Sequence, residues 1–162
     1  MRGSDLTNKG RESFTAFAPL ILWIAVIFFL SSALGSVVHT SRFIRPVLVF
    51  LFPSADDITI EFYHAYVRKA AHFTEYGVLA IFAIRALGRT AAGIFSRYRF
   101  AAALILVAVV ACLDELNQSF EPSRTGSFRD VALDVSGGLT LIIVLMLVRR
   151  FRDGAVRDGF GA

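Results

Sequence analysis

The residues of this chain that could carry chemistry lie near the ends of long apolar segments. One segment contains Arg68, His72, Glu75 and Tyr76 at helical steps of three or four residues, which place them on one helix face. Ionisable groups in apolar segments of membrane length are costly, so they indicate a function by default. A buried Glu75 must be paired or protonated, and Arg68 or His72 is an available partner. Together, a His, a carboxylate and an Arg could transfer protons and bind an anion.

The next apolar segment ends in a second polar group. Asp114 and Glu115 each share a helix face with Gln118. A helix end that emerges into water would explain them in structural terms. However, carboxylates at the C-terminal end of a helix are opposed by the helix dipole, and two adjacent acids there are a cost that a function could explain.

A third polar group begins the last apolar segment. Ser127 followed by Asp130 fits a capping box, which gives Asp130 a structural explanation. Asp134 lies one turn deeper and capping does not explain it. Gly137 and Gly138 follow, and small residues of this kind allow membrane helices to approach closely.

Two interpretations of these polar groups compete. In the first, the carboxylates and His72 hold a divalent metal, and Arg124 orients an anionic group such as phosphate. In the second, the groups neutralise one another and fix helix packing. Neither His-x-x-Glu nor Asp-Glu-x-x-Gln specifies a metal by itself, so the sequence assigns no metal ligand and identifies no cofactor. The predicted catalytic residues are His72, Glu75, Asp114, Glu115 and Gln118, and the predicted substrate-binding residues are Arg68, Tyr76, Arg124, Asp130 and Asp134.

The elements that must position these residues are apolar runs long enough to cross a membrane. The chain is 56% hydrophobic, more than an average soluble domain. Backbone groups cannot stay unpaired in lipid, so helices are the expected spanning form. The expected fold is all-α, an integral membrane protein with a bundle of about four transmembrane helices. The predicted spans are residues 17–34, 63–87, 100–120 and 128–148.

The connection after the first span is not an ordinary polar loop. Ile44, Leu48 and Leu51 recur at helical spacing, but this apolar stretch is too short to cross a bilayer. It predicts a short helix that lies at the interface or re-enters the membrane, with Pro53 at its end.

Basic residues predict the orientation. With Arg85 at the end of the second span included, the N-terminal tail, the connection after that span and the C-terminal tail hold eleven of the seventeen Lys and Arg residues. These three regions are therefore expected in the cytoplasm, and the polar groups on the outer side. The same residues explain the net charge of +4, so a nucleic-acid partner is not predicted. The expected organisation is a cytoplasmic tail over 1–16, one membrane domain over 17–150 and a second tail over 151–162.

At its polar groups, the sequence resembles the VanZ-like family of small bacterial membrane proteins. The resemblance covers residues 63–148 and little of the first span. Two positions depart from the family pattern, because Ser123 stands where the family usually has Gly and Asp134 where it usually has Asn. The matching elements are Arg68-Lys69-Ala70-Ala71-His72-Phe73, Glu75-Tyr76, Leu79, Asp114-Glu115, Gln118, Phe120, Pro122, Arg124, Ser127, Asp130 and Gly137.

The resemblance implies a multi-pass protein of the bacterial inner membrane that acts in the cell envelope. The founding member of the family confers low-level resistance to the glycopeptide teicoplanin. We therefore expect a role in lipid-linked precursor metabolism that affects glycopeptide susceptibility. As an enzyme, the protein would hydrolyse or transfer a group at a phosphorylated lipid, with His72 or Glu115 as acid or base and Arg124 on the phosphate.

Two other classes of function remain open. The protein could be a lipid-headgroup-binding or structural membrane protein that catalyses no reaction. It could also be an ion-coupled transporter, for which four spans require a homo-oligomer. The expected partners are membrane lipids, a phosphorylated or lipid-linked substrate, and further copies of the chain in an oligomer.

Overall fold

The computed structural model describes residues 2–32, 37–90, 97–120 and 127–159, without the side chains of 2–13, 37–39, 90 and 153–159. Within these ranges all regular structure is helical, which confirms the predicted class. The five helices are α1 (Arg2–Leu30), α2 (Val37–Leu51), α3 (Asp57–Thr90), α5 (Arg99–Ser119) and α6 (Phe128–Gly159).

Three of these helices are long and apolar enough to cross a membrane. Their candidate spans are Asp57–Arg89, Arg99–Ser119 and Phe128–Arg152. The apolar part of α1, Phe14–Leu30, is shorter. At about 1.5 Å per residue it covers about 26 Å, slightly less than a hydrocarbon core of about 30 Å. Residues 33 and 34 of the first predicted span lie outside the described residues.

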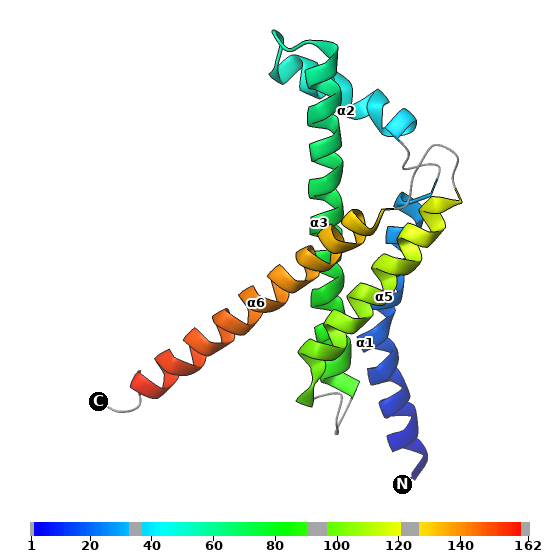
Figure 1. Cartoon of the computed structure of the whole chain (residues 1–162). Coiled ribbons are helices and arrows are strands. Elements are labelled where there is room, and N and C mark those ends of the chain that lie inside the picture. The colour runs from blue at the N-terminus through cyan, green and yellow to red at the C-terminus, as the bar shows by residue number, and fades with distance from the viewer. Residues whose placement is uncertain (1, 33–36, 91–96, 121–126, 160–162) are drawn as a thin grey trace.

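Helix α3 is the central element of the bundle. It packs against α1, α2, α5 and α6. Its fully buried residues Leu79 and Ala83 meet Ile27 of α1 and Val107 of α5 in the apolar core. Figure 1 shows α2 beside one end of α3, while both chain termini lie toward the other end, where α3 finishes and α5 begins. This arrangement places the polar residues of α3 in the half of the bundle that is nearer to α2.

Helix α2 has the properties of an interfacial helix. Phe43, Val47 and Phe50 are exposed along one face, whereas Leu48 is buried. An exposed apolar face of this kind suits the boundary between headgroups and acyl chains. The helix ends two residues before Pro53, as predicted from the sequence.

The start of α3 is fixed by polar contacts. The Asp56 carboxylate accepts a hydrogen bond from the Thr59 backbone N–H at 2.9 Å, which is an N-cap. Hydrogen bonds from the Thr59 side chain and backbone hold the pKa of Asp56 below its ordinary value. Arg45 of α2 also pairs with Asp57 at 2.6 Å. These contacts join α2 to the first turn of α3.

Glycines let α6 cross α3 at short range, as the Gly137–Gly138 pair predicted. A Cβ atom on Gly137 would collide with the backbone carbonyl oxygen of Phe73, the residue after His72. A Cβ on Gly138 would lie 2.8 Å from the Val107 side chain of α5. Gly137 therefore fixes the crossing point of α3 and α6, and Asp134 lies one turn away from it.

The orientation remains a prediction that a fusion experiment can check. Alkaline phosphatase folds only where its disulfides can form, outside the cytoplasm. We expect a fusion after Ser119 to be active and a fusion after Arg89 to be inactive. The opposite pattern would place both termini outside and the polar residues at the cytoplasmic face.

Candidate functional site

A cavity of about 400 Å³ lies among α2, α3, α5 and α6. Its charged and imidazole side chains come from all four helices, although these segments are far apart in the sequence. The basic and imidazole lining residues are Arg45, His64, Arg68, Lys69 and His72, and the acidic ones are Glu61, Glu115, Asp130 and Asp134.

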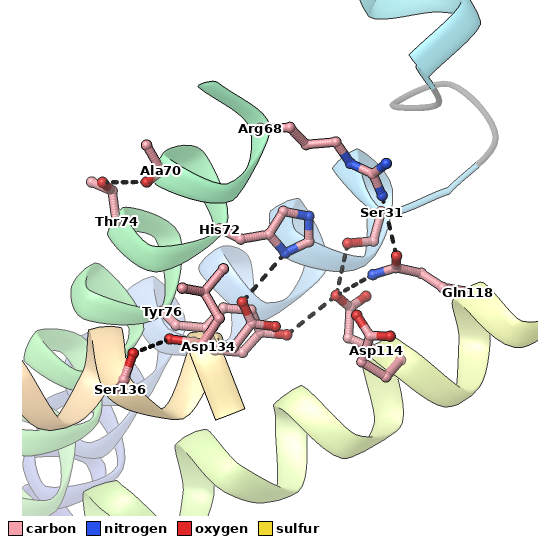
Figure 2. Close-up of polar contacts among 12 residues, drawn as sticks. Ser31, Arg68, Ala70, His72, Thr74, Tyr76, Asp114, Gln118, Asp134 and Ser136 are labelled. Carbon is pink, nitrogen blue, oxygen red and sulfur yellow. Dashed lines mark hydrogen bonds and ion pairs between the residues drawn. The ribbon is translucent and has the colours of Figure 1, made fainter. Parts of the chain in front are cut away.

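Asp114 is a fully buried carboxylate that is held by three helices. Its Oδ2 atom accepts hydrogen bonds from Ser31 Oγ at 2.8 Å, Gln118 Nε2 at 3.0 Å and the Tyr76 hydroxyl at 3.2 Å. Its Oδ1 atom has no hydrogen-bond partner among the described residues. The three donors thus fix the carboxylate and leave one oxygen available (Figure 2).

His72 and Asp134 face each other where α3 and α6 cross (Figure 2). The distance between His72 Nδ1 and Asp134 Oδ1 is 3.5 Å, which is too long for a strong hydrogen bond. The Asp134 side chain is fully buried, and neither of its oxygens has a hydrogen-bond partner among the described residues. His72 is mostly buried and lines the cavity.

Arg68 and Gln118 meet on the wall of the cavity. The Arg68 guanidinium donates to Gln118 Oε1 at 3.4 Å, so Gln118 links Arg68 to Asp114. The hydrogen bond between Gln118 and Asp114 confirms that these two residues share a face of α5. The contact between Arg68 and Gln118 places a cation next to the cavity, and the described salt bridges do not pair Arg68 with a carboxylate.

Glu115 has a structural contact that the sequence did not predict. Its Oε2 atom accepts a hydrogen bond from the Ser127 backbone N–H at 2.8 Å. Ser127 Oγ accepts from the Arg129 N–H at 3.2 Å, which confirms Ser127 as the cap of α6. The predicted capping box gave the Ser127 N–H to Asp130. In the structure Glu115 takes that position, and Asp130 lines the cavity.

Three predicted site residues lie outside the cavity lining. Glu75, Tyr76 and Asp114 are not among the described residues that line it. The Glu75 backbone carbonyl accepts from Trp23 Nε1 at 2.9 Å, and the Tyr76 hydroxyl bonds Asp114 below the cavity. Within the described residues, no ion pair joins Glu75 to Arg68 or His72, the two partners that the sequence offered. Arg124 lies outside the described residues.

The structure adds two residues that the sequence analysis missed. Ser31, at the end of the first apolar segment, bonds Asp114. His64 is buried, lines the cavity and lies 3.3 Å from Thr40 Oγ1 of α2. A signal for His64 was present, because it precedes Arg68 and His72 by one and two helical turns. Ser31 has no such spacing signal, since its partner is distant in sequence.

The cavity combines two kinds of chemistry. Arg45, Arg68 and Lys69 supply positive charge that suits a phosphate or carboxylate. Deeper in the site, His72 and Asp134 lie beside the free oxygen of Asp114, an environment that suits a cation or a proton. An anionic group can therefore bind to the basic residues of the cavity, while the buried acids Asp114 and Asp134 lie deeper in the site.

Comparison with known proteins identifies a family. The VanZ/LLP1 family model matches residues 16–149, which is 134 of the 162 residues. No match to a curated protein or to a solved structure was found. The match begins in α1, so the first helix belongs to the family domain, although the sequence resemblance covered little of it. The Ser31–Asp114 and Trp23–Glu75 contacts give this helix a place beside the site.

Proposed function

The chain belongs to the VanZ/LLP1 family of multi-pass membrane proteins, and on that premise we propose that it binds the phosphorylated headgroup of an envelope lipid in its cavity and hydrolyses or transfers a group at the phosphate. The observation that carries this proposal is the placement of Arg68 and Lys69 above buried acids in one cavity of a membrane helix bundle. Isolated buried charges are costly, so a cavity that gathers both signs is best explained by a charged ligand.

The surroundings of the cavity suit a lipid. Ile58, Phe62 and Tyr66 are exposed along α3, next to the residues that line the cavity. Such apolar side chains can contact acyl or prenyl chains while the headgroup lies among the polar residues. The proposed substrate is therefore a lipid with a phosphate or diphosphate headgroup.

The chemistry is proposed at His72. Of the two residues expected to carry a proton, Glu115 holds the start of α6 through the Ser127 N–H. His72 instead lines the cavity beside Asp134. The reacting phosphate would therefore lie next to His72, with Arg68 on its oxygens. On the outer face of the inner membrane this reaction would act on lipid-linked envelope precursors and so change teicoplanin susceptibility.

A second candidate function rests on Asp114. Tyr76 of α3, Gln118 of α5 and Ser31, which follows α1, all donate hydrogen bonds to this one carboxylate, which is the arrangement of a packing contact. It favours a protein that binds lipid headgroups without chemistry. The two candidate functions use the same cavity for the lipid headgroup and differ only in whether the bound lipid is chemically changed.

Headgroup binding can be tested with short-chain lipids in detergent. A ligand at about 100 times its Kd stabilises the folded state by about 2.7 kcal/mol. We expect dihexanoyl phosphatidic acid to raise the unfolding temperature of the purified protein, and dihexanoyl phosphatidylcholine to leave it unchanged. The Arg68→Gln variant should lose much of this stabilisation, because it lacks one of the three cations on the cavity wall.

The matched control is Arg85→Gln, which removes an exposed Arg from the opposite end of the same helix. It should keep the full response to phosphatidic acid. Equal stabilisation by both lipids, or an equal response in the two variants, would contradict binding of the phosphate in this cavity.

A further inference from the structure

We infer that His72 and Asp134 at the cavity wall and Asp114 behind them form a binding site for one divalent metal ion. A ligand atom from each of these residues lies within 4.8 Å of the other two. The residues come from α3, α5 and α6, so the site exists only when the bundle is folded. Neither the family match nor the proposed reaction requires this ion, but the two proposals give His72 different roles: with the ion bound, His72 is a ligand and does not transfer a proton.

The unused oxygens carry the inference. Asp114 and Asp134 are both fully buried. Three of their four carboxylate oxygens, Asp114 Oδ1 and both oxygens of Asp134, have no hydrogen-bond partner among the described residues. Buried polar groups are almost always paired, and an ionised carboxylate without a partner is very costly to bury. One bound cation could be coordinated by oxygens of both carboxylates and would so compensate their charge.

The cations already present do not satisfy them. The Arg68 guanidinium donates to Gln118, and the described salt bridges pair Asp134 only with His72, at 3.5 Å. That separation is too long for a strong hydrogen bond. It is, however, a normal distance between two ligands of one ion, since bonds of about 2.1 Å place neighbouring ligands about 3.0–4.2 Å apart. The remaining distances, of up to 4.8 Å, need only a small inward movement of the side chains.

The surroundings of Asp114 also resemble those of a metal ligand. Ser31, Tyr76 and Gln118 all donate to Oδ2, which orients the carboxylate and leaves Oδ1 free. Carboxylates that bind metals are commonly oriented by such donors. Figure 2 shows Ser31 and Gln118 joined to Asp114 by dashed lines.

The ligand set indicates the class of ion. One imidazole and two carboxylates suit Mn²⁺ or Zn²⁺ better than Ca²⁺, which prefers oxygen ligands alone, or Cu⁺, which prefers sulfur. Three protein ligands leave at least one coordination position open. Because His72 and Asp134 line the cavity, that position faces the space proposed for the phosphate.

Metal binding can be measured without any substrate. The full chain, purified in detergent and stripped with EDTA, is titrated with Mn²⁺ followed by electron paramagnetic resonance, and with Zn²⁺ followed by equilibrium dialysis. We expect one ion per chain. His72→Ala and Asp134→Asn remove ligands and should weaken binding by at least about 100-fold, and Ser31→Ala, which removes an orienting donor, by about 10- to 100-fold.

The matched control is Glu61→Gln, which removes a carboxylate from the cavity wall outside the three ligands and should bind the ion as the wild type does. Less than about half an ion per folded wild-type chain would overturn the inference. So would unchanged affinity in Asp134→Asn, because an Asp134 that is simply protonated can be replaced by its amide. If both ligand variants fail to elute as folded protein, the Ser31→Ala affinity decides. Repeating the phosphatidic acid experiment with EDTA and with Mn²⁺ separates a failure of this site from a failure of the proposed function.

Discussion

Replacing Gly137 by Ala is expected to destabilise this protein more than any other single-methyl change in α6. The added Cβ would collide with the Phe73 carbonyl oxygen, which is part of the α3 backbone and cannot rotate away as a side chain can. Overpacking of a core costs about 1–3 kcal/mol and occasionally more. The better helix propensity of Ala returns about 1 kcal/mol of this. Because the obstacle is backbone, we expect the upper end of the difference, a net loss of about 2 kcal/mol.

The same change should damage the site. Phe73 follows His72, and Gly137 lies one turn from Asp134, so separation of α3 from α6 at this point lengthens the 3.5 Å contact between His72 and Asp134. Denaturant unfolding in detergent, followed by circular dichroism, measures the stability. Metal titration of the fraction that stays folded measures the site.

Gly88→Ala is the matched control. A Cβ at this position in α3 would lie 3.5 Å from the Arg99 side chain, an ordinary van der Waals distance. This variant should be as stable as the wild type, or more stable by up to about 1 kcal/mol. Equal stability of Gly137→Ala and Gly88→Ala would show that the two helices do not cross as closely as described.

Much of the fold could be predicted from the sequence because the bilayer imposes simple rules. An apolar run of about 20 residues must be a helix in lipid. The last three predicted spans therefore correspond closely to α3, α5 and α6. Pro53 correctly marked the end of the short helix α2, although proline alone does not decide an end, since Pro46 lies inside the same helix. The first span was predicted over 17–34 like the others, but the apolar helix Phe14–Leu30 is shorter than the three candidate spans.

The site was predicted only in part. Helical spacing placed Arg68 and His72 on one face, and Asp114 and Gln118 on another, and the cavity and the Gln118–Asp114 bond agree with both. Spacing within one helix cannot say which helix faces which. The sequence therefore offered His72 only partners on its own helix, such as Glu75, whereas the crossing at Gly137 brings it to Asp134.

Two further differences have the same cause. The Ser127 N–H goes to Glu115 and not to Asp130, because the end of α5 lies against the start of α6. Ser31 joins the site from α1, across 83 positions of sequence. Both are contacts between helices, which depend on the packing of the whole bundle. Local propensity and periodicity carry no information about them.

The central claim is that the cavity carries out chemistry on a phosphorylated lipid, and its most direct test is turnover by the purified protein in vesicles. Wild type is incubated with a polyprenyl diphosphate and with its monophosphate, in the presence of Mn²⁺ or Zn²⁺, and release or transfer of phosphate is measured. Electrostatic and acid–base groups at a reacting centre each contribute about 100-fold or more to the rate. Arg68→Gln and His72→Ala should therefore each lower the rate by at least about 100-fold, while Arg85→Gln keeps it.

The account predicts that the wild type turns over at least one of these lipids. It also predicts that Arg68→Gln and His72→Ala both lose this activity while reaching wild-type abundance in the membrane. Absence of turnover from the folded, metal-loaded wild type would contradict it and would leave headgroup binding without chemistry as the function of the cavity. Full turnover in both Arg68→Gln and His72→Ala would contradict it equally, because the reaction would then take place elsewhere.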